Sequence, residues 1–391
     1  MKHGGWVVMV LVGACSGTPA RDGGVTDAGI DGGHDAGLPD AGEDAGFDAG
    51  ADAGVDAGLD AGLPMACVQR QAALQAALDA ALNSQAASAA TASLDCPTLT
   101  VSSGPLSDAG TLYRIGSVTK TYVSATVITL EHEGALSLDD TLDKWSLPVP
   151  DAGAITVRQL LNHTAGLFNY TDDPAVQNAQ TISMPVTPEQ MVAIAAQHPP
   201  YFAPGAGWHY SNTDYVLLGM IVKEATDGGL ADAISQRAFG PAHLSHTFLD
   251  GEQALDGGLV PGFDQSTDVT HLMDPSWAWA AGAMVAAPSD VADWVFRLYR
   301  GEVLPDGGTA ELTANAIDTG QGVQYGLGVA ILPAAATGGR GVAIGHDGAI
   351  PGFQAFAFYF PQKQASLVVT IDSDSADINA VYAALMQALF P

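Results

Sequence analysis

Strand-like and helix-like patterns are unevenly distributed along this chain. Near the C-terminus, four segments read as consecutive strands: Gly326 to Leu332, Gly341 to Gly345, Phe353 to Phe360 and Ser366 to Asp372. A further strand is expected far upstream, over Pro97 to Ser102, whereas residues 155 to 240 look mainly helical. The pattern predicts an α+β fold with one sheet built from both ends of the chain and a helical insertion in the middle.

Three further helices complete this expectation. An alanine-rich segment starting near Met65 places apolar side chains on one helical face, at Val68, Leu74, Leu78 and Leu82. A helix is also expected over Pro288 to Leu298, and a closing helix over Ile378 to Phe390. Folded sequence is therefore expected over residues 65–391.

The first fifteen residues read as an export signal. A short polar start precedes the apolar run Trp6 to Val12, and the small residues Gly13 and Ala14 precede Cys15. This string resembles a bacterial lipobox, so we expect Cys15 to be lipidated and to anchor an exported protein to a membrane. Ser16 after the cysteine favours the outer membrane or cell surface of a two-membrane bacterium. The alternative is an ordinary signal peptide that is cut nearby.

Residues 16–64 form an acidic linker dominated by an Asp-Ala-Gly repeat. A segment with so little apolar surface cannot offset the entropy of ordering its backbone, so we expect it to be disordered. The regular spacing of its aspartates suggests calcium binding, but the repeat lacks the Gly-Gly-x-Gly-x-Asp pattern of calcium-binding β-rolls. A self-repelling charged spacer is the preferred interpretation. A protein that serves mainly as a surface spacer is a further hypothesis.

Charge and hydropathy exclude some classes of protein. The net charge is −30 with only 13 basic residues, which argues against a nucleic-acid partner. No apolar stretch of about 20 residues follows the N-terminus, so no transmembrane helix is expected in the body of the chain. Nothing requires a metal or an organic cofactor, and we expect a monomer.

Two cysteines lie beyond the signal segment. Because exported chains meet an oxidising compartment, Cys67 and Cys96 are expected to form a disulfide. Two buried thiols are the alternative.

Ser117 and Lys120 form the pattern Ser-x-x-Lys. A serine hydroxyl is a poor nucleophile until a base removes its proton, and a lysine three residues later on a helix lies on the same face. Lys120 is the only one of five lysines with a serine at that spacing. A capped helix start with a solvated lysine is the alternative.

Tyr210 and Asn212 form the only Tyr-x-Asn among ten tyrosines. A phenol near an ammonium can act as a general base, and an amide can orient a lysine or hold a substrate. Alternatively, both residues cap a helix.

Histidines mark two further stretches. In His346-Asp347-Gly348-Ala349, the glycine would let a substrate approach a strand closely, although a hairpin with a surface histidine also fits. In the stretch Leu160 to Leu167, His163 is expected to hydrogen-bond loop backbone near the site. No metal role is expected for His163, and His243 and His246 read as a loop pair.

Together these motifs resemble the serine β-lactamase and penicillin-binding-protein superfamily. The similarity is to its class C β-lactamase and D-Ala-D-Ala carboxypeptidase branch, which includes esterases and D-amino-acid peptidases. It covers roughly residues 67 to 391, with the motifs in the family's order, and it extends to Ala280 to Met284 and Tyr325 to Gly328. The resemblance implies a β-lactamase/transpeptidase-like fold, with an antiparallel sheet flanked by helices and a mainly helical subdomain.

The resemblance also implies a role for each motif residue. Ser117 would form an acyl-enzyme, while Lys120 and Tyr210 would shuttle its proton. Asn212 would position Lys120 and the substrate. His346 stands where many members carry lysine, and it would polarise Tyr210 or contact substrate.

The resemblance places the oxyanion hole at the backbone N–H groups of Ser117 and Ala349. The field at a helix N-terminus would favour the negative charge that develops there.

The chain departs from the family pattern in three places. The segment between Cys67 and Ser117 is short, with one clear strand where two are expected, so the sheet could be trimmed at one edge. Ala165 replaces a common serine, which we expect to be minor. Asp347 replaces a Thr or Ser that helps to bind a substrate carboxylate, and an aspartate would repel that group.

The leading hypothesis is therefore an exported, membrane-tethered serine hydrolase that acts on an ester or on an amide or peptide. Because of Asp347, substrates without a carboxylate beside the scissile bond are preferred. A β-lactamase or D-Ala-D-Ala carboxypeptidase is the alternative enzyme. A non-catalytic binding lipoprotein with the same fold is the alternative of another class.

Overall fold

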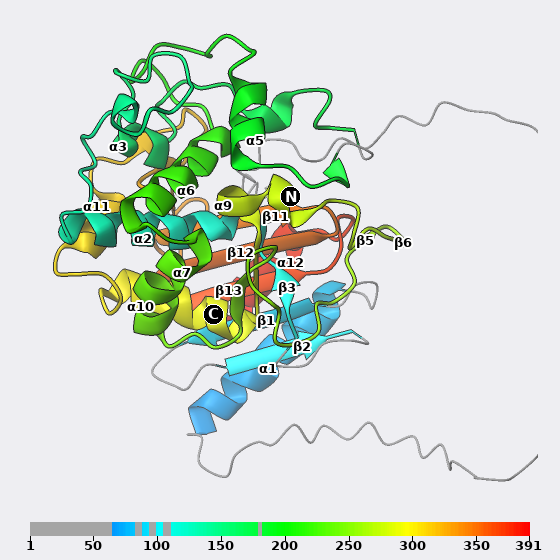
Figure 1. Ribbon diagram of the computed structural model, residues 1–391. Coiled ribbons are helices and arrows are strands. Elements are labelled where there is room, and N and C mark those ends of the chain that lie inside the picture. Colours follow the sequence, from blue (N-terminus) through cyan, green and yellow to red (C-terminus); the bar gives the residue numbers. More distant parts are fainter. Residues whose placement is uncertain (1–64, 83–87, 94–98, 105–110, 179–181) are drawn as a thin grey trace, which may run out of the picture. The chain divides into compact units, whose positions relative to one another are not determined.

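The computed structural model describes residues 65–82, 88–93, 99–104, 111–178 and 182–391 (Figure 1). These residues belong to one compact unit. The expected signal segment with Cys15, the acidic linker of residues 16–64 and Cys96 lie outside the described residues. Cys67 is buried and disulfide-bonded. Because Cys96 lies outside the described residues, the pairing of these two cysteines stays a prediction.

The described residues contain helices of several lengths. The α-helices are α1 (Met65–Leu82), α2 (Thr119–His132), α3 (Val157–Leu161), α5 (Pro188–Ala195), α6 (Asn212–Thr226), α7 (Leu230–Ile234), α8 (Gly240–Ala242), α9 (Trp279–Gly282), α10 (Pro288–Arg300), α11 (Gly308–Thr313) and α12 (Ile378–Leu389). Short 3₁₀ turns are η1 (Gly116–Val118), η2 (Leu142–Trp145), η3 (Tyr170–Asp172) and η5 (Pro275–Trp277), and η4 (Ser235–Phe239) is a π-helical turn.

The strands form one large and two small sheets within the described residues. They are β1 (Ser88–Ser93), β2 (Leu99–Ser103), β3 (Tyr113–Arg114), β4 (Thr247–Leu249), β5 (Phe263–Asp264), β6 (Thr267–Asp268), β7 (Met284–Ala286), β8 (Ile317–Asp318), β9 (Gln324–Tyr325), β10 (Ala330–Leu332), β11 (Ala343–Ile350), β12 (Phe353–Phe360) and β13 (Ala365–Ile371). The large sheet is antiparallel with the order β2-β1-β13-β12-β11-β10-β9-β8. Its strands come from both ends of the folded chain, as the sequence predicts.

Alternating side chains of the central strands face two different layers. On β12, Phe356 and Phe358 join a cluster with α1 and α12, whereas Ala357 and Tyr359 join the larger core of the helical side. Helix α10 packs on β12 and β13 from that helical side, and α1 lies beside α12 although the two are far apart in sequence (Figure 1). Both faces of the sheet are therefore covered.

The helical part agrees with the sequence pattern. Leu74 and Leu78 of α1 are fully buried, and Pro288 is the first residue of α10, where a missing N–H has no cost. Within the described residues, no helix combines the length and the apolar character needed to span a bilayer.

The edge of the sheet differs from the expectation. We expected one strand between Cys67 and Ser117, but both β1 and β2 are present, and β1 pairs with β13 on one side and β2 on the other. The sequence of β1, Ser-Ala-Ala-Thr-Ala-Ser, has no large apolar alternation, so pairing rather than periodicity defines it.

Two strand boundaries also differ. The strand expected over Gly326 to Leu332 is shortened to β10, because residues 326–329 form the turn after β9, in which Gly328 takes a left-handed φ of 75°. The strand expected to end at Gly345 continues as β11 to Ile350, which carries the His346 motif into the sheet.

Candidate active site

Ser117 lies in a tight turn at the start of α2. Gly116 has a φ of 51°, the turn η1 follows, and α2 begins at Thr119 rather than at Ser117. The Thr119 hydroxyl donates to the Gly116 carbonyl at 2.7 Å and accepts the Met284 N–H at 3.1 Å. These bonds fix the turn against β7, and they leave Ser117 8% exposed at the helix N-terminus.

Lys120 occupies the first turn of α2 and is completely buried. Its Nζ donates to Ser117 Oγ at 2.9 Å, to Asn212 Oδ1 at 2.9 Å and to the Ala281 carbonyl at 2.7 Å. Three acceptors match the three hydrogens of an ammonium group. The solvated lysine of the alternative interpretation is therefore wrong, because desolvation leaves this amine dependent on its protein partners.

Asn212 is the first residue of α6, and its amide is held on both sides. The Asn212 N–H donates to Asn169 Oδ1 at 3.0 Å, and Nδ2 donates to Thr171 Oγ1 at 3.3 Å. Oδ1 is therefore left to face Lys120. The N-cap residue is Ser211, and the helix N–H of Asn212 is bonded by the Asn169 side chain, so the helix-cap alternative for Tyr210 and Asn212 is wrong.

Tyr210 lies in the loop before α6 with 6% of its surface exposed. Lys120 Nζ is 4.8 Å from the centre of its ring. Two further rings lie near the Tyr210 ring: the His163 ring centre is 4.5 Å away and the Tyr325 ring centre is 6.3 Å away. The phenol thus shares one buried site with Ser117 and Lys120.

Two glycines, Gly116 and Gly348, bring β11 against the turn that holds Ser117, which is called the nucleophile turn below. A Cβ on Gly348 would lie 2.1 Å from the Ile115 carbonyl oxygen and 2.9 Å from Ser117 N, and one on Gly116 would lie 2.7 Å from Ala349 N. The backbone nitrogens of Ser117 and Ala349 therefore meet at one place, as an oxyanion hole requires. We expected Gly348 to admit a substrate, but the protein's own backbone makes the close approach.

His346 is buried on β11, and its expected contact with substrate stays a prediction. Its Nε2 is 2.9 Å from the Tyr325 hydroxyl, and its Nδ1 forms a short hydrogen bond with the Asp347 carbonyl. Burial, together with the charge of Lys120, lowers the pKa of His346 to about 3. A neutral ring with these partners contacts Tyr325 rather than polarising Tyr210 through a hydrogen bond. The alternative of a surface histidine is wrong, since 1% of the residue is exposed.

Asp347 is only 3% exposed, next to His346 on β11. It pairs with Phe356, whereas Gly348 pairs with Ala355, so the Asp347 side chain lies on the other face of the sheet from Gly348. Its influence on a substrate at Ser117 would therefore act mainly as an electric field. That field reaches the site, because Asp347 adds to the burial that raises the pKa of Tyr325 well above its ordinary value.

The remaining histidines fit their expected roles. His163 accepts the Ser211 N–H at its Nδ1, so it does bond loop backbone near Tyr210. His243 takes a left-handed φ of 57° after α8, and His246 bonds the neighbouring Ser245. No cluster of three metal-ligating side chains occurs in the part of the chain that the structure describes.

Sequence reasoning missed two residues that contribute hydrogen-bond partners to the candidate active site. The carbonyl of Ala281 in α9 accepts from Lys120, and a backbone acceptor has no signature of its own in a sequence. Asp214, two residues after Asn212, lies 2.9 Å from His163 Nδ1. Its signal would have been a carboxylate in the first turn of an otherwise apolar helix.

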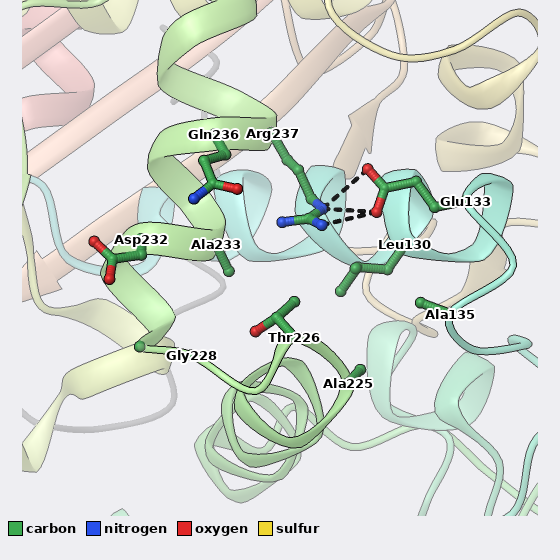
Figure 2. A pocket seen from close by; sticks show the side chains of 11 residues that line it. Leu130, Glu133, Ala135, Ala225, Thr226, Gly228, Asp232, Ala233, Gln236 and Arg237 are labelled. Atoms are coloured by element: carbon green, nitrogen blue, oxygen red, sulfur yellow. Dashed lines mark hydrogen bonds and ion pairs between the residues drawn. The ribbon is translucent and has the colours of Figure 1, made fainter.

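A separate surface hollow lies where the C-terminal ends of α2 and α6 meet α7 and η4 (Figure 2). Arg237 points across it to Glu133, with which it forms three hydrogen bonds. None of the residues around Ser117 lines this hollow.

A family model described as beta-lactamase matches residues 75–388. The chain belongs to the β-lactamase family. The predicted family and the α+β fold of the β-lactamase/transpeptidase type are thereby confirmed.

Similar proteins include curated relatives and solved structures. A penicillin-binding protein of Bacillus subtilis is 24% identical over 66% of this β-lactamase-family chain, and a D-aminopeptidase of Cereibacter sphaeroides is 24% identical over 72%. The chain spans 60% and 54% of the lengths of these two relatives. The structure of a D-stereospecific amidohydrolase from Streptomyces sp. is 31% identical with a TM-score of 0.73, covering 80% of this chain and 98% of that one.

Proposed function

We propose that this β-lactamase-family protein hydrolyses an ester or amide through an acyl-enzyme on Ser117. The observation that carries the proposal is the 2.9 Å contact between Lys120 Nζ and Ser117 Oγ inside a buried site. A donor to Ser117 Oγ orients the hydroxyl so that its own proton can leave towards Tyr210.

The reaction runs in two halves. Ser117 Oγ attacks the carbonyl carbon while its proton passes to the Tyr210 oxygen, which acts as a phenolate stabilised by the Lys120 ammonium, and the Ser117 and Ala349 N–H groups stabilise the oxyanion. Tyr210 then gives a proton to the leaving alcohol or amine, and the acyl-enzyme remains. Water, deprotonated by Tyr210, attacks the acyl carbon and regenerates Ser117.

The charge around the site supports substrates without a carboxylate next to the scissile bond. Asp347 contributes a buried negative field, and the whole chain carries a net charge of −30. The names of two similar proteins, the D-aminopeptidase and the D-stereospecific amidohydrolase, describe amide hydrolysis and so support an amide as the substrate class.

Purified protein offered p-nitrophenyl acetate, amino-acid amides and nitrocefin tests this proposal. We expect ester or amide turnover to exceed nitrocefin turnover, and Ser117→Ala to abolish it. The Asp347→Asn variant should raise kcat/KM for nitrocefin about tenfold relative to the ester, since only the charge is removed.

Fast nitrocefin turnover with slow ester and amide turnover would favour a β-lactamase. No effect of Asp347→Asn would show that the charge of Asp347 does not set the substrate preference. Folded protein that a fluorophosphonate does not label at Ser117 would identify the non-catalytic binding protein instead.

We also propose that the protein is exported and anchored through a lipid on Cys15, as a bacterial surface hydrolase carried on an acidic spacer. The small residues before Cys15 and the disulfide at Cys67 support export. Metabolic labelling with a fatty acid should mark the wild type but not Cys15→Ser. Deletion of residues 22–62 should leave hydrolysis unchanged, and loss of activity would support the spacer hypothesis.

A further inference from the structure

Tyr210 is held from both of its chain neighbours by a single residue. The His209 N–H donates to the His163 carbonyl at 3.1 Å, and the Ser211 N–H donates to His163 Nδ1 at 3.3 Å. The His163 ring also lies against the Tyr210 ring, 4.5 Å between centres. His163 itself takes a left-handed φ of 61°, a conformation that costs free energy in a residue with a Cβ.

The Ser211 contact determines which nitrogen of His163 carries the proton. A backbone N–H can only donate, so Nδ1 must offer a lone pair and the proton must sit on Nε2. Asp214 Oδ2 lies 2.9 Å from the same Nδ1. The single lone pair of Nδ1 then faces both the Ser211 N–H and Asp214 Oδ2, so a protonated Asp214 keeps the 2.9 Å contact attractive and the two donors share that lone pair. An imidazolium–carboxylate ion pair would leave the Ser211 N–H facing another hydrogen.

The surroundings agree with a neutral pair. Burial raises the pKa of Asp214 well above its ordinary value, although Lys120 opposes this. Burial also lowers the pKa of His163 well below its ordinary value, and Lys120, His346 and His209 act in the same direction. The groups facing the pair come from α2, α6, β9, β11 and the loop before α6, namely Lys120, Tyr215, Tyr325, His346, His209 and Tyr210.

The pair leaves two polar atoms unused. His163 Nε2 and Asp214 Oδ1 are buried and have no hydrogen-bond partner among the described residues.

We propose that His163 is a positioning residue for Tyr210, and that a proton held by Asp214 keeps His163 in the tautomer that binds Ser211. This inference rests on the proposed acyl-enzyme function, in which Tyr210 moves the proton. His163 and Asp214 do not touch the reacting atoms. They hold the phenol where it can exchange a proton with Ser117 and the leaving group.

Four variants test the proposal through kcat, KM and the pH profile of p-nitrophenyl acetate hydrolysis. His163→Phe keeps a ring against Tyr210 but removes the acceptor, and we expect kcat to fall about 10²-fold with little change in KM. His163→Asn restores an acceptor and tolerates the left-handed backbone, so it should recover at least about tenfold of that loss. Asp214→Leu should resemble His163→Phe, whereas Asp214→Asn should keep kcat and leave the pH profile unshifted because an amide donates as a protonated carboxyl does.

Matched controls are His243→Phe and His243→Asn, at an exposed histidine with a similar left-handed φ of 57°. Wild-type kcat in His163→Phe, no recovery in His163→Asn, or a shifted pH profile in Asp214→Asn would each overturn the proposal. If the wild type neither turns over an ester nor labels at Ser117, the proposed function fails and the positioning role fails with it. Nitrogen NMR at neutral pH tests the tautomer without turnover, and a protonated Nδ1 on His163 would refute it.

Discussion

At the residue scale, Lys120 connects three separate parts of the fold. Its ammonium donates to the nucleophile turn, to the first residue of α6 and to α9. A buried cation is costly unless its hydrogens are all bonded, so these contacts hold the three segments of the site together.

Replacement of Lys120 by methionine, which is similar in length, should remove this activation. We expect kcat/KM for an ester to fall about 10²–10⁴-fold, the usual contribution of a positioned acid–base group, because Tyr210 loses the ammonium beside its ring. The rate of Ser117 labelling by a fluorophosphonate should fall in parallel. The control is Lys144→Met, because the Lys144 side chain is half-exposed and pairs with Asp140. Equal rates in Lys120→Met and wild type would contradict the assigned role.

Gly348 belongs to the same scale. An alanine there would place a Cβ 2.1 Å from the Ile115 carbonyl oxygen, so β11 and the nucleophile turn must separate. We expect Gly348→Ala to lower kcat about 10²–10³-fold, as for the loss of an oxyanion donor, with folding retained.

Steady-state kinetics and circular dichroism check the Gly348 prediction. Gly258→Ala is the matched control, because no atom lies within 4 Å of the added Cβ. A fully active Gly348→Ala variant would show that the two backbone nitrogens do not act together.

At the element scale, the contact between α6 and α9 sets the distance between two of the Lys120 acceptors. Asn212 begins α6, and Ala281 lies in α9. The helices approach closely at Gly219, where a Cβ would lie 2.6 Å from Ala280 Cβ and 2.8 Å from the Trp279 ring.

Gly219→Ala should therefore both destabilise the protein and disturb catalysis. Overpacking of this kind lowers the free energy of unfolding by about 1–3 kcal/mol. Because α9 must shift, we expect kcat to fall more than KM rises. Chemical denaturation and ester kinetics measure the two effects, with Gly228→Ala, where the nearest atom is 3.5 Å away, as the control. Unchanged kcat in a destabilised variant would show that the position of α9 does not affect catalysis.

At the scale of the whole molecule, buried neutral histidines make folding sensitive to acid. The pKa of His346 is lowered to about 3, and that of His163 is also lowered. The unfolded chain takes up protons below pH 6.5, its ordinary histidine value, while the folded chain does not. Each histidine therefore contributes stability above that pH, which is lost as pH falls towards its folded pKa.

For His346 the expected loss is about 1.4 kcal/mol per pH unit, or about 2 kcal/mol between pH 6.5 and pH 5. Urea unfolding of the wild type and His346→Gln at both pH values measures it, because a glutamine cannot take up this proton. The variant should lose about 2 kcal/mol less than the wild type on acidification, and His243→Gln should lose as much as the wild type. Equal losses in His346→Gln and wild type would show that His346 is charged when folded.

The periodic and local features of the sequence were sufficient for much of this molecule. The apolar alternation of Phe353 to Phe360 identified β12, and the spacing of Leu74 and Leu78 identified α1, since both patterns follow from burying one side of a regular element. The spacing of Ser117 and Lys120 placed both side chains on one face of a single turn. The strand β1 was missed because its sequence has no large apolar alternation, and its pairing with β13 and β2 forms only on folding.

Other features depended on residues that meet only after folding. The carbonyl of Ala281 has no side-chain signature, and the His163–Asp214 contact joins residues 51 positions apart. The burial of Asp347 and His346 likewise follows from the layers packed on β11.

The sequence alone therefore determined the family and most of the secondary structure, and it predicted the chemical identity of the reacting groups, because these depend on local spacing and side-chain type. Only the tertiary structure decided which hydrogens Lys120 donates to which acceptors, which tautomer His163 adopts and how closely Ala349 approaches Ser117. Those properties arise from desolvation and from distances between distant segments, and neither exists until the chain has folded.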